Sequence, residues 1–232
     1  MTSIIVLVAT IVIACLLRNP IKKAPVLFYA ISVALVIVFF MLPTLGTPRA
    51  VNLAFFWTIQ KCLAPLALFI LVMYIGVFPR DSAPSRWLRP IRAELSIIAW
   101  ILTLGHVVQY LQNYLKPIFS GVPLQMNIFI GIIVAILLFV LLIVLGVTSF
   151  QFVKKHMSRT SWKNVQKLAY PFFGLTYVHL VCLLLPSAMR GRIAATVSIA
   201  VYSVVFIAYL ILRIMRAMAD RGIEAKEDAE EA

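Results

Sequence analysis

The sequence predicts an all-α integral membrane protein with seven transmembrane helices. Of its 232 residues, 63% are hydrophobic and only 12% are charged, whereas soluble domains are about one quarter charged. The apolar residues also gather in seven segments separated by short polar connections. These segments use almost the whole length, and no G-x-G-x-x-G or P-loop string occurs. We therefore expect no separate nucleotide- or flavin-binding domain in this chain.

The first segment, residues 3–17, is near the short limit for a membrane span. It begins without basic residues and lacks a small-residue cleavage site, so it predicts a retained helix rather than a secretory signal. Residues 216–232 are acidic and alanine-rich, which predicts a frayed cytoplasmic tail. The other six spans are predicted at residues 25–42, within 50–78, and at 93–115, 126–152, 165–185 and 194–214.

Basic residues alternate between the connections in a way that predicts the orientation of the chain. They concentrate in the first, third and fifth connections and after the last span. Because cytoplasmic loops carry an excess of Lys and Arg, we expect a multi-pass protein of the cell (inner) membrane with its N-terminus outside and its C-terminus in the cytoplasm. The residues assigned to the cytoplasmic side are Arg18, Lys22, Lys23, Arg80, Arg86, Arg89, Arg92, Lys154, Lys155, Arg159, Lys163, Arg213, Arg216 and Arg221.

The net charge of +13 is explained by these short basic loops, so we expect contact with membrane lipid and no nucleic-acid partner. Cys15, Cys62 and Cys182 each lie within an apolar run and are not paired by spacing. They therefore predict neither a disulfide framework nor a Cys-x-x-Cys metal site.

Two histidines interrupt apolar runs: His106 in the fourth predicted span and His179 in the sixth. An ionisable side chain at hydrocarbon depth is costly unless it is paired, so each is a functional-site candidate. His106 lies 14 residues beyond Arg92, and His179 lies 13 residues beyond Gln166. Both imidazoles are therefore about 20 Å from the cytoplasmic boundary, in the outer half of a core about 30 Å thick. Equal depth on two helices favours one metal bound between them.

A b-type haem with two histidine ligands fits this pair best, since it needs only two axial nitrogens and a flat apolar slot. Zinc needs three or four ligands, and no Cys, Asp or Glu is expected at this depth. The same lack of a mid-membrane carboxylate argues against a proton pump or a proton-coupled transporter. The alternative is that the two histidines only bridge helices by hydrogen bonds.

Lys61 and His156 can each be interpreted as a functional residue or as an ordinary surface residue. Lys61, on the third predicted span, would pair with a haem propionate or approach a quinone head group. Equally, the span could begin later, and Lys61 would then extend to the outer interface. His156 lies in the basic fifth connection and is expected to be a solvated loop residue, with docking of an acidic partner as the weaker alternative.

The segment from Thr148 to Val181 resembles the ferric reductase-like transmembrane domain family. In that family a Thr-Ser pair precedes a W-K-x-L-H-x-L-x-Y stretch, and a second histidine follows the first by thirteen residues. Here Thr148 and Ser149 precede the stretch Trp162 to Tyr170, and His179 holds the second histidine position. The family includes NADPH oxidases, metalloreductases and the haem-binding membrane subunit of the bacterial periplasmic methionine-sulfoxide reductase system.

The resemblance extends over about residues 50–215 and implies a six-helix haem bundle with one extra N-terminal helix. It divides the chain into that helix with its basic loop (1–24), a ferric reductase-like domain (25–215) and the tail (216–232). His106 and His179 fall at the positions that bind the outer haem in the oxidases. The inner-haem positions hold Arg92 and Gln166 instead of histidines. The resemblance therefore implies one haem b per chain where the oxidases hold two.

One haem in the outer half leaves a gap of about 20 Å to the cytoplasm. A quinol or flavin near Arg92 and Gln166 would fill this gap, with both side chains hydrogen-bonding a quinone carbonyl or a flavin edge. Alternatively, electrons enter and leave on the outer side, and Arg92 is only a topology charge. We thus expect a membrane cytochrome b between a quinol or cytosolic flavin reductase and an extracytoplasmic redox protein. A cofactor-free membrane anchor or scaffold subunit is the competing hypothesis.

Overall fold

The computed structural model describes the backbone of residues 2–79, 81–120 and 125–230, and their side chains except at 116–118 and 222–230. These residues form helices and turns and no strand, so the all-α prediction is confirmed. Arg80 and the last two residues of the predicted tail lie outside the described residues. The helices are α1 Thr2–Leu16, α2 Arg18–Lys23, α3 Pro25–Leu45, α4 Arg49–Phe55, η1 Phe56–Gln60, α5 Leu63–Ile75, α6 Ala83–Leu88, η2 Arg89–Ile91, α7 Arg92–Phe119, α8 Met126–Ser149, α9 Gln151–Lys155, α10 Arg159–Gln166, α11 Ala169–Met189 and α12 Ile193–Glu230.

Five helical stretches of the described chain are long and apolar enough to cross a membrane, and a bent pair brings the number to six if it counts as one span. The pair consists of Arg49–Gln60 and Leu63–Ile75, which meet at 43°. α1 has 15 residues, fewer than the about 20 that a span usually needs. A multi-pass membrane protein is therefore established, while the count of seven spans remains a prediction.

The third predicted span is not one continuous helix. Its first part ends in the π-helical turn η1, and Cys62 then adopts a left-handed conformation with φ 57°. A non-glycine residue in this region costs about 1–2 kcal/mol. Pro65 follows three residues later and lacks the N–H that would bond back to Lys61 in a continuous helix. A single span within residues 50–78 stays a prediction, since the bent pair can count as one span; hydropathy does not report the interruption.

α5 is the central helix of the bundle. Ten of its 13 residues are buried, and it contributes to both apolar clusters of the core. One cluster joins α5 to α1, α3 and α7, and the other joins it to α1, α11 and α12. α3 and α8 instead have few buried residues, and each exposes nine large apolar side chains. This exposure is expected of faces in contact with lipid.

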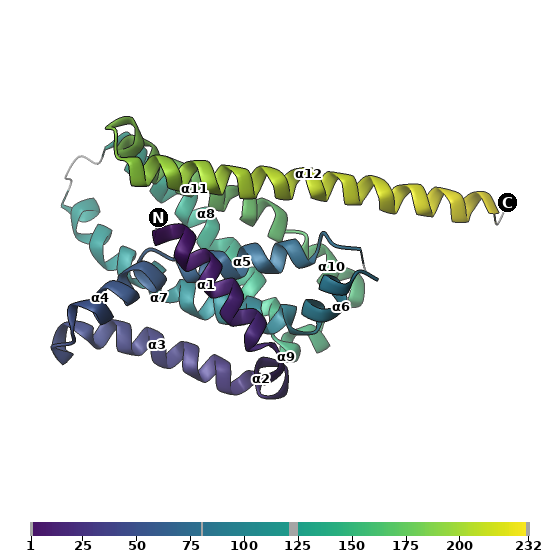
Figure 1. Cartoon of the computed structure of the whole chain (residues 1–232), viewed down its shortest axis with the longest axis horizontal. Coiled ribbons are helices and arrows are strands. Elements are labelled where there is room, and N and C mark those ends of the chain that lie inside the picture. Colours follow the sequence, from purple (N-terminus) through teal and green to yellow (C-terminus); the bar gives the residue numbers. More distant parts are fainter. Residues whose placement is uncertain (1, 80, 121–124, 231–232) are drawn as a thin grey trace.

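The short basic helices gather at one end of the bundle. In Figure 1, α2, α6, α9 and α10 lie toward the right-hand end of the bundle, the direction in which α12 projects, whereas α4 and the junction of α11 with α12 lie at the left. The basic connections that alternate along the sequence thus lie at one end of the bundle in space. Which end faces the cytoplasm remains a prediction from that charge.

α12 extends through the region where a frayed tail was predicted. The helix runs from Ile193 to Glu230 and projects past the other helices (Figure 1). Alanine, glutamate and lysine are strong helix formers, and Arg216 forms an ion pair with Asp220 at 2.8 Å, one turn apart. The expectation of a frayed segment from residue 216 was therefore wrong, because it weighed charge above helix propensity.

Candidate functional site

His106 is fixed by the interruption in the third span. It lies on α7, and its Nδ1 is 2.7 Å from the backbone oxygen of Gln60. Gln60 is the last residue of η1, and the break at Cys62 frees its carbonyl from the regular helical pattern. Because a carbonyl oxygen can only accept, Nδ1 must carry the proton and donate it.

His179 is fixed in the same way on another helix. It lies on α11, and its Nδ1 is 3.1 Å from the backbone oxygen of Gly131 on α8. A Cβ added at Gly131 would lie 3.1 Å from a methyl carbon of Leu183, also on α11. The absence of a side chain at Gly131 therefore lets α11 approach the backbone of α8 closely enough for this hydrogen bond.

Both imidazoles are therefore protonated on Nδ1, and both leave Nε2 free. With Nδ1 donating to a carbonyl, Nε2 is unprotonated and keeps its lone pair. No hydrogen bond reaches either Nε2 from the part of the chain that the structure describes. An imidazole with Nδ1–H bonded to a carbonyl and Nε2 free is the usual form of a metal-ligating histidine.

Lys61 and Tyr110 lie beside His106. The Tyr110 ring is 4.7 Å from the His106 ring, and Lys61 Nζ donates to the Tyr110 hydroxyl at 3.3 Å. Lys61 Nζ also lies 5.2 Å from the centre of the Phe56 ring. Lys61 is exposed, so its position is compatible both with a pairing role at the site and with an interfacial cation.

Arg92 and Gln166 line one cavity, as the inner-site hypothesis requires. The cavity has a volume of about 320 Å³ and lies between α5, α7, α8, α10 and α11. Arg92 Nε donates to the backbone oxygen of Val72 at 3.1 Å, and its terminal nitrogens have no hydrogen-bond partner in the part of the chain that the structure describes. Apolar side chains of Phe69, Leu142 and Phe172 form part of the wall. A cavity with a polar mouth and an apolar wall is typical of a site for an organic ligand.

The Thr-Ser and Trp-Lys parts of the sequence motif meet at this cavity. Trp162 Nε1 donates to the backbone oxygen of Thr148 at 3.0 Å, and Gln166 Nε2 donates to the Thr148 hydroxyl at 3.1 Å. These two bonds tie α10 to the end of α8. The spacing between Thr148 and Gln166 in the motif therefore has a structural consequence, because it places Gln166 at the cavity.

Trp100 is a cavity residue that sequence reasoning missed. It lines the 320 Å³ cavity, and its buried Nε1 has no hydrogen-bond partner among the described residues. A Cβ added at Gly146 would overlap the indole, so the glycine makes room for it. Arg92, Ser96 and Trp100 recur every four residues on α7, a pattern that could have indicated a shared face.

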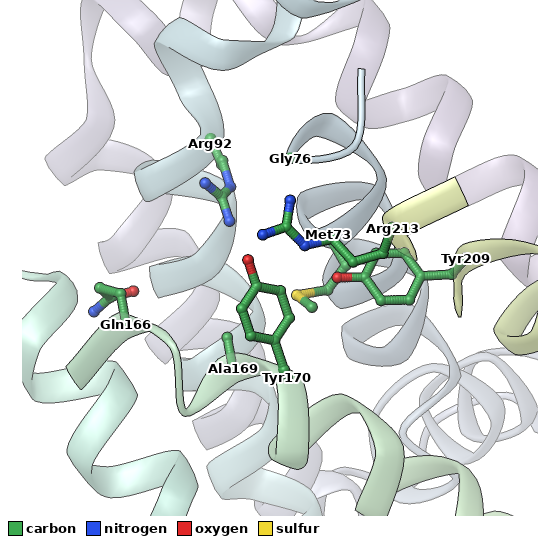
Figure 2. A pocket seen from close by; sticks show the side chains of 8 residues that line it. All are labelled: Met73, Gly76, Arg92, Gln166, Ala169, Tyr170, Tyr209 and Arg213. Carbon is green, nitrogen blue, oxygen red and sulfur yellow. The ribbon is translucent and has the colours of Figure 1, made fainter. Parts of the chain in front are cut away.

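A second, smaller cavity adjoins the first at Met73, Arg92, Gln166 and Ala169. Its volume is about 80 Å³, and Tyr170 and Arg213 complete its polar lining. Figure 2 shows the guanidinium groups of Arg92 and Arg213 pointing toward the same space, with the Tyr170 hydroxyl between them. From the sequence, Arg213 was interpreted only as a topology charge.

The remaining candidates lie elsewhere. His156 is exposed, and its Nδ1 bonds the backbone oxygen of Phe152 at 2.8 Å, one turn earlier on α9. All three cysteines are free thiols. Over residues 2–79, 81–120 and 125–230, no group of three or more His, Cys, Asp or Glu side chains could hold a metal ion.

Comparison with known proteins gives two matches. The family described as "Ferric reductase like transmembrane component" matches residues 66–177. An uncharacterized protein of Treponema pallidum (strain Nichols) is 36% identical over 233 positions, which covers 95% of this chain and 62% of that protein. The chain thus spans about 62% of the length of the curated relative it matches. No solved structure matches the chain.

Proposed function

We propose, from the match over residues 66–177, that this chain is a member of the ferric reductase like transmembrane component family. Membership indicates a membrane redox component. Within that class, we propose a cytochrome b that holds one haem b between His106 and His179. The donor would be a quinol or a flavin, and the acceptor an extracytoplasmic redox protein.

The observation that carries this proposal is the shared tautomer of the two histidines. Each Nδ1 donates to a backbone carbonyl of a neighbouring helix, so each Nε2 is left as a ligand without any change of protonation. The two nitrogens come from different helices, α7 and α11, as two axial ligands of one group would. Haem is the group that accepts two axial nitrogens and needs no third protein ligand.

A bound haem would supply one-electron redox chemistry, and the residues of this chain would set its surroundings. Gln60 and Gly131 would fix the direction of the two imidazoles through their carbonyl groups, and these bonds also raise ligand basicity. The Tyr110 ring, 4.7 Å from His106, would limit rotation of that imidazole. Lys61 would supply a positive charge on the same side.

The 320 Å³ cavity is the proposed place of the donor. Arg92 and Gln166 offer hydrogen-bond donors there, and the Trp100 ring forms part of the wall. Quinone and flavin ring systems both carry carbonyl acceptors. Along α7, Trp100 and His106 are six residues apart, about 9 Å in a helix. A donor beside Trp100 would therefore shorten the gap of about 20 Å to the cytoplasm.

We also propose the orientation and partners that follow from charge. The basic end of the bundle would face the cytoplasm, with the N-terminus outside and the protein in the cell (inner) membrane. The bis-histidine site would then lie in the outer half of the membrane, near an extracytoplasmic partner. Lipid would cover the apolar faces of α3 and α8.

The test is a reduced-minus-oxidised visible spectrum of the full chain, purified from cells supplied with haem, with haem and protein quantified separately. We expect about one haem per chain and the spectrum of a six-coordinate low-spin b haem. A preparation that is monodisperse but lacks a Soret band would overturn the proposal and leave the cofactor-free scaffold, which the Nδ1 bonds alone also permit.

Lys61→Met is expected to lower the reduction potential of the haem. Loss of a nearby positive charge favours the more positive, oxidised iron, and the effect should be on the order of tens of millivolts because the side chain is exposed and screened. Lys61→Arg keeps the charge and serves as the control. An unchanged potential in a spectroscopic redox titration of Lys61→Met would show that Lys61 is only an interfacial cation.

A further inference from the structure

The mouth of the two adjoining cavities is lined by cations and by no acid. Arg89, Arg92 and Lys154 line the larger cavity, and Arg92 and Arg213 line the smaller one. Neither lining contains Asp or Glu. Among the side chains that the structure describes, the only ion pair joins Arg216 to Asp220. Neither Arg92 nor Arg213 therefore forms an ion pair with a carboxylate there.

Each guanidinium group has one contact that orients it, and its terminal nitrogens have no hydrogen-bond partner among the described residues. Arg92 uses Nε for Val72, and the guanidinium carbon of Arg213 lies 4.9 Å from the centre of the Tyr170 ring. Both side chains line the cavity of about 80 Å³, and Figure 2 shows both directed at one small space with the Tyr170 hydroxyl. Two like charges held face to face without a counter-charge indicate a missing anion.

We propose that Arg92, Arg213 and Tyr170 form a binding site for a phosphate ester group. The planar guanidinium fork binds phosphate oxygens in pairs, and a tyrosine hydroxyl adds one donor. The cavity of about 80 Å³ has room for a head group rather than a whole cofactor. This site is distinct from the histidine pair, and the inference does not depend on haem.

The position of the site favours an acidic phospholipid as the source of the phosphate. It lies between the start of α7, the start of α11 and the middle of α12, toward the end where the basic helices gather (Figure 1). Basic pockets between membrane helices on the cytoplasmic side are typical sites for lipid head groups. A soluble phosphate ester would use the same donors.

The test is lipid retention by the full chain, stripped in detergent and measured by native mass spectrometry with phosphatidylglycerol or phosphatidylcholine added. We expect Arg213→Gln and Arg92→Gln each to reduce retention of phosphatidylglycerol about tenfold or more, because each removes charge-assisted hydrogen bonds. Arg216→Gln is the matched control: it removes an equal charge from the same helix, but Arg216 already pairs with Asp220. Its retention should be unchanged.

A second pair of variants keeps the test valid if the Gln variants fold poorly. Arg213→Lys retains the charge without the planar fork, and Tyr170→Phe removes only the hydroxyl; both should weaken retention by less than Arg213→Gln. Thermal stabilisation by inorganic phosphate or glycerol 3-phosphate that depends on Arg213, without lipid retention, would support the site with a soluble source. Equal effects of Arg213→Gln and Arg216→Gln, or no response to any of these probes, would overturn the proposal.

Discussion

Replacement of either histidine ligand is expected to remove the haem. His106→Ala and His179→Ala each delete an Nε2 that nothing among the described residues can replace. Loss of an outer hydrogen-bond partner of a metal ligand already costs about 10–100-fold in affinity, so loss of the ligand itself should cost at least about 100-fold. We expect purified variants to have less than about one tenth of the wild-type haem per chain.

His156→Ala is the matched control for this pair, since it removes an exposed imidazole on α9. Its haem content should equal that of the wild type. Haem should be measured by pyridine haemochrome extraction, with size-exclusion chromatography to show that each variant is folded. Full haem occupancy in either His106→Ala or His179→Ala, with a low-spin spectrum, would rule out the proposed ligand pair.

The substitution Gly146→Ala is expected to destabilise the helix bundle and to deform the 320 Å³ cavity. A Cβ there would overlap the Trp100 indole, whose ring packs directly on the glycine. Overpacking of a core usually costs about 1–3 kcal/mol, and we expect Gly146→Ala to lower the free energy of unfolding by that amount. Because Trp100 lines the cavity, its displacement should also weaken binding of the quinol or flavin donor proposed there.

Gly174→Ala is the control, because a Cβ at that position of α11 would contact nothing within 4 Å. It should be neutral or slightly stabilising, since alanine favours a helix over glycine by about 1 kcal/mol. Stability can be compared as the temperature at which half of the protein leaves the monodisperse size-exclusion peak. The double variant Gly146→Ala with Trp100→Leu should recover part of the loss, and equal stabilities of Gly146→Ala and Gly174→Ala would contradict the predicted overlap.

The sequence alone determined the class of the protein and the first residues of several long helices. Apolar runs longer than about 18 residues have few alternatives to a span, and α7 and α8 begin at Arg92 and Met126, within one residue of their predicted starts. The motif from Thr148 to Tyr170 indicated the resemblance to the family. That resemblance led to the prediction that Arg92 and Gln166 share one inner site. The structure places these two residues at a common cavity.

Only the tertiary structure decided how the site is held. The carbonyl groups of Gln60 and Gly131 are backbone atoms, so no residue type signals that they would fix His106 and His179. The unpaired Trp100 Nε1 and the convergence of Arg213 on Arg92 depend on contacts between helices far apart in sequence. Hydropathy and spacing report periodicity along one helix, whereas these features depend on which faces of different helices meet.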